Sequence, residues 1–296
     1  MLFALAAAVC YAVHAASNKY LLNAWPRPLG FVLLVMALEG AFALPVALLT
    51  GGIEWVSPVA VNFLATATFI FVANIFVFDA YEREDASITG PILGLKVVIL
   101  AVLESVMGLK PVGPGIWAGA FLATAGVVLL CQTGRWIPRL GTLIRPGIGL
   151  VALGAFLYAF ADLNANRALV AWGSGLAFGL HVNMATGLVA GAALLGLKVA
   201  GRDAVPPFRI AFLPAASAAG LLGAQILLFM AFSATRAVTA CNIVYSSRAL
   251  LVVGLMALLV LGAGSKVEKA GGKTYLRRAA GAVLLLAGIV LALIGR

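Results

Sequence analysis

Long apolar stretches alternate with short polar ones along nearly the whole chain. A helix needs roughly 20 residues to cross a hydrocarbon core of about 30 Å. The stretches are continuous and do not alternate residue by residue, and lipid leaves unpaired backbone groups without partners, so the pattern predicts helices and not a β-barrel. We expect ten spans, at residues 2–20, 29–50, 58–78, 87–108, 113–131, 147–169, 174–197, 208–232, 238–262 and 278–295.

Two stretches of the chain occur twice. AGAFLATAGVVL at 118–129 returns as AGAVLLLAGIVL at 280–291, with eight of twelve positions identical. A second pair, ALAAAVCYAVHAASNKYLL from Ala4 and ALGAFLYAFADLNANRALV from Ala152, keeps the same order along the chain. The shared glycines and asparagine are the strongest part of this evidence, because identical Ala or Leu residues often align by chance in an apolar chain. The pattern indicates an internal duplication.

Five spans in each copy have a geometric consequence. Because five is odd, the second copy enters the membrane from the opposite face, which gives an inverted-topology repeat of the kind that alternating access uses. The predicted fold class is therefore an all-α integral membrane protein with ten transmembrane helices in a 5+5 inverted repeat. We expect one transmembrane transporter domain over 1–296, with a first five-helix repeat at 1–134 and a second at 147–296.

Composition agrees with a membrane location. The 296 residues are 64% hydrophobic and 10% charged, with a mean hydropathy of +1.11. A water-soluble domain of this composition would have too little polar surface to cover itself. The expected localisation is the cell membrane, crossed many times.

The net charge of +10 is a topology signal. When the loops are assigned alternately to the two sides, fourteen Lys and Arg residues fall on one side and four on the other. Cytoplasmic loops carry such an excess, so both termini are expected on the exterior or periplasmic side. This distribution points to the lipid bilayer and away from nucleic acid as the partner.

Signals for soluble enzymes are absent from the sequence. It contains no phosphate-binding glycine loop, HExxH pattern, GxSxG motif or Cys/His metal spacing. The three cysteines, Cys10, Cys131 and Cys241, are far apart and lie in apolar stretches. We expect no catalytic residue, metal or cofactor, and the protein is not expected to be an enzyme.

The chain resembles the drug/metabolite transporter superfamily in its ten-span form with two EamA-type repeats. The residues that carry the likeness are ILAVLESVMGL at 99–109, which contains Glu104, GIWAGAFLATAGVVLL at 115–130, and RRAAGAVLLLAGIVLAL at 277–293. In this family each half has a fourth helix that ends in a glutamate, a short turn and a glycine-rich fifth helix. The second half here has no counterpart of Glu104, which favours a structural role at the helix end over a catalytic or coupling role.

Two cations within the spans are the main candidates for substrate binding. When AYEREDASITGPILGLKVVIL from Ala80 is aligned with AFSATRAVTACNIVYSSRALL from Ala231, Lys96 falls opposite Ser247, one residue from Arg248. Ionisable groups in the bilayer are costly and are usually functional or paired. A two-fold axis would bring Lys96 and Arg248 to opposite sides of one cavity.

Three interpretations of this pair stay open. Lys96 and Arg248 can clamp a carboxylate or phosphate; VYSSRALLVVGL at 244–255 is similar to the ninth helix of the triose-phosphate translocators of the same superfamily, whose adjacent Lys-Arg pair is Ser247-Arg248 here. Alternatively, Glu39 and Asp162 neutralise the two cations. In the third interpretation these pairs open to receive the two ends of a zwitterion.

Other polar residues are weaker candidates. His14 aligns with Asp162 and could form a proton-responsive element with it, since imidazole titrates near neutrality; the alternative is a hydrogen-bonded packing residue. Glu39, Asp162 and His14 are thus the coupling or ion-pair candidates. The remaining substrate-binding candidates are Tyr245, Asn242, Ser246, His181 and Asn74.

These features predict a secondary active transporter or exchanger that moves a small polar metabolite across the membrane by alternating access. The charge pair favours an anionic substrate, a carboxylate or a phosphate. Two alternatives are an exporter of amino acids or other zwitterionic metabolites and a flippase for a lipid-linked substrate. The expected partners are the small-molecule substrate, the bilayer, and a proton or counter-substrate; the sequence leaves monomer and homodimer open.

Overall fold

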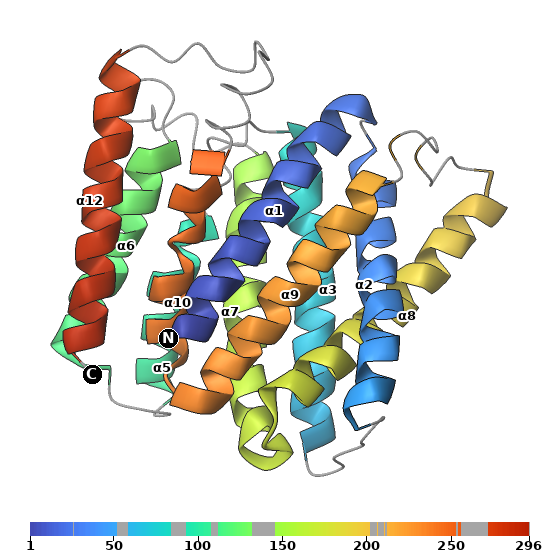
Figure 1. The fold of residues 1–296 in the computed structure, drawn as a ribbon, viewed down its shortest axis with the longest axis horizontal. Helices are drawn as coiled ribbons and strands as arrows, with labels where there is room; N and C mark the ends of the chain where they lie inside the picture. The colour runs from blue at the N-terminus through green and yellow to red at the C-terminus, as the bar shows by residue number, and fades with distance from the viewer. Residues whose placement is uncertain are drawn as a thin grey trace.

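A computed structural model shows the chain as a bundle of helices, with no strand in the part of the chain that it describes (Figure 1). The predicted all-α class is confirmed for these residues. The described residues are 1–25, 27–51, 59–83, 93–107, 112–131, 146–201, 206, 210, 212–252, 254–255 and 272–295.

The helices follow the apolar stretches of the sequence closely. Within the described residues, six helices are long and apolar enough to cross a membrane: Leu29–Thr50, Ala60–Ala80, Pro146–Trp172, Gly175–Val199, Phe212–Thr235 and Leu276–Ile294. Shorter apolar helices accompany them. The helices are α1 (Leu2–Ala24), α2 (Pro28–Thr50), α3 (Ala60–Arg83), α5 (Lys96–Val106), α6 (Pro114–Cys131), α7 (Pro146–Trp172), α8 (Gly175–Val199), α9 (Phe212–Thr235), α10 (Val238–Tyr245) and α12 (Gly272–Ile294).

Two of the predicted spans are interrupted in the structure. The span expected at 87–108 is helical at 93–94, turns at Leu95 and continues as α5; residues 84–92 lie outside the described part. The span expected at 238–262 begins as α10, turns at Ser246 and Ser247, and is helical again at 248–252. Hydropathy cannot detect such interruptions, because it does not report on backbone hydrogen bonding.

The helices pack in pairs that join the two halves of the chain. Helix α1 packs along α9, α3 along α7, α2 along α8, and α6 along α12 (Figure 1). This pattern of pairs is unchanged when the first half, α1–α6, and the second half, α7–α12, exchange places. The halves are therefore interlocked and do not form separate bundles.

Glycine allows the closest of these contacts. A Cβ added at Gly126 of α6 would lie 2.6 Å from the Leu285 nitrogen, and one added at Gly119 would lie 2.7 Å from the Gly288 oxygen. Higher numbers on α6 thus meet lower numbers on α12, so the two helices are antiparallel. They contain the repeated sequence AGAFLATAGVVL and AGAVLLLAGIVL, and the two copies of this motif pack against each other. Small residues are common at helix contacts in membranes, because lipid removes the hydrophobic driving force for helix association and close backbone packing takes its place.

Helices α2 and α8 cross at a second glycine contact. A Cβ at Gly40 would lie 2.8 Å from the Gly187 Cα, and a Cβ at Gly187 would lie 2.6 Å from the Gly40 Cα. Helices α2 and α8 are equivalent helices of the two halves and pack on each other. Their crossing is therefore a contact between the two halves. We call it the α2–α8 crossing.

We expect Gly126→Ala to lower the melting temperature of the purified protein, because the new Cβ would press on the backbone of α12. Overpacking of this kind typically costs about 1–3 kcal/mol. Gly196→Ala is the matched control, since Gly196 lies in α8 with nothing within 4 Å of an added Cβ. Thermal unfolding in detergent would show the difference, and equal melting temperatures for the two variants would contradict the close contact.

Candidate substrate site

Both candidate cations stand directly after an interruption of a helix. Lys96 is the first residue of α5, after the turn at Leu95. Arg248 is the first helical residue after the turn at Ser246 and Ser247. The backbone keeps helical angles at Leu95 and Ser246, and at Ser247 the amide donates to the carbonyl oxygen three residues back in place of four, so each interruption is a local tightening of the helix. Substrate sites of secondary transporters are often built where helices are irregular. Helices α5 and α10 also contact each other, so the two interruptions belong to one region of the bundle.

Lys96 is already paired within the protein. Its Nζ lies 2.6 Å from Asp162 Oδ2 of α7, and both side chains are less than a tenth exposed. Asn242 Nδ2 of α10 donates a second hydrogen bond of 2.8 Å to the same carboxylate oxygen. A buried charge is tolerated when it is paired and hydrogen-bonded. The pair therefore ties α5, α7 and α10 together.

A tyrosine extends this polar cluster to α3. The Tyr158 ring lies beside the Lys96 ammonium, with 5.6 Å between Nζ and the ring centre. Its hydroxyl donates to Asn74 Oδ1 at 2.7 Å. Asn74 is buried and donates from its amide to the Ile70 carbonyl oxygen at 3.0 Å. Asn74, Lys96, Asp162 and Asn242, all proposed from the sequence, thus come together.

Arg248 lies against two tyrosine rings. Its Cζ is 4.3 Å from the centre of the Tyr11 ring and 4.4 Å from that of Tyr245. Contact with ring faces is favourable for a guanidinium group and keeps its plane in place. The side chain is only half-buried, unlike that of Lys96. Of the two cations, Arg248 is the more open to a ligand.

The two serines at the interruption differ in their hydrogen bonding. Ser246 donates to the Asn242 carbonyl oxygen of its own helix at 2.9 Å. Ser247 is buried, and its Oγ has no hydrogen-bond partner among the described residues. Ser247 is therefore the better candidate for a substrate contact, although the sequence analysis chose Ser246. The alignment of Ser247 with Lys96 was the signal that could have identified it.

His14 takes part in a closed hydrogen-bond network between α1 and α9. Its Nδ1 lies 2.9 Å from Ser217 Oγ and 3.1 Å from the Ser217 carbonyl oxygen, and Asn18 Nδ2 donates to Nε2 at 2.9 Å. Ser217 in turn donates to Asn18 Oδ1 at 2.6 Å. The structure does not bring His14 and Asp162 into contact, since Asp162 bonds to other partners. Both imidazole nitrogens are occupied, as expected of a packing residue.

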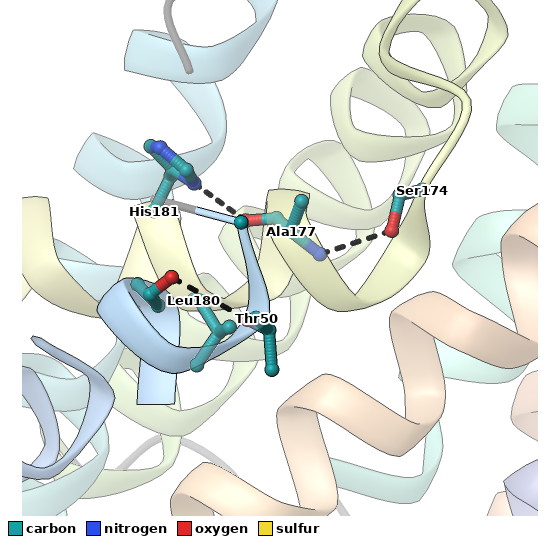
Figure 2. A pocket seen from close by; sticks show the side chains of 7 residues that line it. Thr50, Ser174, Ala177, Leu180 and His181 are labelled. Atoms are coloured by element: carbon teal, nitrogen blue, oxygen red, sulfur yellow. Dashed lines mark hydrogen bonds between the residues drawn. The ribbon is translucent and has the colours of Figure 1, made fainter. Parts of the chain in front are cut away.

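His181 lies apart from the cluster. Its Nδ1 hydrogen-bonds to the Ala177 carbonyl oxygen at 2.7 Å, and its ring packs 5.2 Å from that of Trp172. Trp172 is ten positions from Asp162 along α7, a rise of about 15 Å. His181 instead lines a pocket at the end of α2 and the start of α8, together with Ala47, Thr50, Gly51, Ser174, Ala177 and Leu180 (Figure 2).

The two remaining acids have different surroundings. Glu104 accepts a hydrogen bond of 2.6 Å from the Thr239 hydroxyl, which links the last turn of α5 to α10 and suits the expected structural role. Glu39 is 1% exposed, and its Oε1 has no hydrogen-bond partner. Among the described residues Glu39 forms no ion pair with Lys96 or Arg248, so the expected pairing of both acids with both cations is found only for Lys96 and Asp162.

Comparisons with known proteins agree with this architecture. The model of the EamA-like transporter family matches residues 1–132. A solved crystal structure superposes on the chain with a TM-score of 0.76 at 16% sequence identity, covering 100% of this chain and 96% of the other. No curated protein matches the chain significantly. The structural match shows that the fold is shared, and it includes the second half, which the family model does not reach. The resemblance predicted from the sequence is thus confirmed for residues 1–132, which match the EamA-like transporter family model.

Proposed function

We propose that the protein is a secondary transporter that moves a small polar metabolite by alternating access between two inverted five-helix repeats. The observation that carries this proposal is the buried polar cluster at two interrupted helices, one in each half of the chain. A cluster of charges inside a membrane bundle is costly unless it serves transport or pairing. The helix pairs, which are unchanged when the halves exchange, support the inverted repeat.

Arg248 is the proposed contact for an anionic substrate. Its N–H groups can bind a carboxylate or phosphate through two parallel hydrogen bonds. The Tyr11 and Tyr245 rings hold the guanidinium plane, which lowers the entropy lost when a ligand binds. The Ser247 hydroxyl, buried and without a partner among the described residues, supplies a neutral group beside it.

A zwitterionic substrate is the second candidate, and the Lys96–Asp162 pair favours it. This buried pair offers one charge of each sign within 2.6 Å. A substrate with an ammonium and a carboxylate group could replace the internal partners without leaving either charge unpaired. An anion could use Lys96 only by leaving Asp162 without its partner, which is costly in a buried site.

Counterflow in proteoliposomes tests the function. Vesicles loaded with one unlabelled compound should take up the same labelled compound, with inorganic phosphate, phosphoenolpyruvate, succinate, alanine and putrescine as probes and a fluorescent lipid as a sixth. We expect exchange of an anionic or zwitterionic probe and no movement of the lipid. Movement of the lipid alone would replace the proposal with a flippase, and exchange of putrescine alone would exclude the anion site.

The variant Arg248→Gln should lower the affinity for an anionic probe by about 30-fold or more, because truncating one partner of a buried charged contact costs about 2–5 kcal/mol. The affinity of Arg248→Lys should lie between that of the wild type and that of Arg248→Gln, since the lysine offers a point charge in place of the planar guanidinium. Arg83→Gln is the control: it removes the same charge at an exposed pair with Asp79. Probe binding, measured by thermal shift, should be unchanged in Arg83→Gln. An equal loss of affinity in Arg248→Gln and Arg83→Gln would rule out a specific role for Arg248.

Breaking the Lys96–Asp162 pair should destabilise the fold. Lys96→Gln and Asp162→Asn should each cost about 3–5 kcal/mol, because each leaves a buried charge without its partner. The double variant, which has no charge to bury, should recover much of the melting temperature. If the double variant is stable yet no longer exchanges alanine, the pair binds a zwitterion; if it exchanges alanine normally, the pair is architectural.

From the charge distribution we expect the 132–147 and 263–277 loops in the cytoplasm and Met1 and Arg296 outside. In a background without the three native cysteines, Leu140→Cys should resist a membrane-impermeant maleimide applied to intact cells, and Leu2→Cys should react. Residue 140 lies outside the described part of the chain, so this expectation comes from the sequence. Labelling in the opposite pattern would reverse the orientation and leave the fold untouched.

A further inference from the structure

Glu39 stands at the centre of α2, twelfth of the 23 residues from Pro28 to Thr50. It directly precedes Gly40, which touches Gly187 of α8 at the α2–α8 crossing. The side chain is 1% exposed, and its Oε1 has no hydrogen-bond partner among the described residues. A buried carboxyl oxygen without a described partner thus lies where helices of the two halves of the chain meet.

The helices around Glu39 bring no cation close to it among the described residues. On α8, His181 and Lys198 stand six and eleven positions from Gly187, a rise of about 9 and 16 Å along the axis. Helix α9 carries no charged or titratable side chain between Phe212 and Thr235.

The described charged side chains of helix α3 also lie away from Glu39. Asp79 and Arg83 pair with each other near its end. Phe78, next to Asp79, packs on Phe31, with 5.3 Å between the ring centres. Since Phe31 is eight positions before Glu39 on α2, this pair lies about 12 Å along the helix from the acid.

A second unpartnered oxygen lies at the same crossing. Asn183 of α8 is fully buried; its amide donates to the Gly179 carbonyl oxygen at 2.8 Å, while its Oδ1 has no partner. Its backbone oxygen is 3.1 Å from the position of a Cβ at Gly40. Glu39 Oε1 and Asn183 Oδ1 are thus two buried oxygens without a partner among the described residues, on neighbouring parts of α2 and α8. A proton on Glu39 would remove the charge that is costly to bury.

We propose that Glu39 is the proton-binding site that couples this transporter to a proton gradient. This inference rests on the proposed transport function and adds its coupling ion. In the closed crossing seen here, the carboxyl group holds the proton. When the crossing opens to one side, the O–H bond breaks, the proton passes to water on that side, and the carboxylate that remains is hydrated until the crossing closes again.

The geometry of the crossing explains how one residue could sense the movement of the halves. Because Gly40 and Gly187 meet without side chains, α2 and α8 can shift against each other without displacing a bulky group. Any change in their separation alters the access of water to the neighbouring Glu39. Protonation and the conformation of the two halves are then linked.

The first test uses the proton as the probe and needs no substrate. Infrared difference spectra of the protein in lipid vesicles should show the C=O stretching band of a protonated carboxylic acid at neutral pH, and Glu39→Gln should remove it. Glu104→Gln is the matched control, because Glu104 is also buried but accepts a hydrogen bond from Thr239. It should keep the band. A wild-type protein without the band, or a band that survives in Glu39→Gln, overturns the proposal.

The second test separates coupling from exchange. With an inward proton gradient, the wild type should accumulate the probe that passes the counterflow assay, by up to about tenfold per pH unit for one proton per molecule. Glu39→Gln, which resembles the protonated acid, should lose this accumulation and keep counterflow, whereas Glu104→Gln should keep both. Accumulation that is unchanged in Glu39→Gln, or that requires sodium in place of the proton gradient, contradicts the proposal.

The outcomes distinguish a failure of the transport function from a failure of the proton coupling. A wild type that exchanges none of the probes overturns the transport function and the coupling with it. A wild type that exchanges a probe but does not accumulate it under a proton gradient overturns the coupling alone. Glu39→Gln should fold like the wild type; a variant that fails to fold would show that a charged carboxylate is needed at this position, against the proposal.

Discussion

Inside a bilayer every polar group must find its partner within the protein, and much of this structure follows from that constraint. Helices are the elements that satisfy their own backbone, so the apolar stretches become helices. Packing between them then depends on close contact, which glycine allows at Gly126 against α12 and at Gly40 against Gly187. Several of the polar side chains that remain are gathered into networks such as those of His14 and of Lys96, whereas Glu39 Oε1 and Ser247 Oγ have no partner among the described residues.

These networks differ in whether hydrogen bonds or charges are paired in them. One joins α1 to α9 through hydrogen bonds between neutral side chains, those of His14, Asn18 and Ser217. Lys96 and Asp162 balance charge against charge. Charge pairs of this kind can be replaced by a ligand that carries the same charges, whereas a neutral network offers a charged ligand nothing to replace. This difference is the physical reason for placing the substrate at Lys96 and Arg248.

The sequence predicted the helical architecture well, because hydropathy reports directly on the lipid environment. The duplicated motif also identified α6 and α12 as equivalent, and they pack on each other in the structure. The interruption at Ser246 and Ser247 was not predicted, since backbone hydrogen bonding leaves no trace in hydropathy. The partners of His14, and the lack of a partner for Glu39 Oε1 among the described residues, could not be predicted either. They depend on how each helix is rotated about its axis, and an alignment of two copies relates equivalent residues without saying which of them touch.

Divergence between the two halves has a consequence for the resting state. If the halves of the proposed inverted repeat were identical, a two-fold rotation would convert the inward-open form into the outward-open form, and the two would have equal free energy. Asp162 aligns with His14 of the first half, and the two residues make different sets of bonds. In the proposed transporter, opening toward one side would therefore affect the Lys96–Asp162 pair differently from opening toward the other. Such an imbalance would give the empty protein a preferred orientation, and with it one side of the membrane from which substrate first enters.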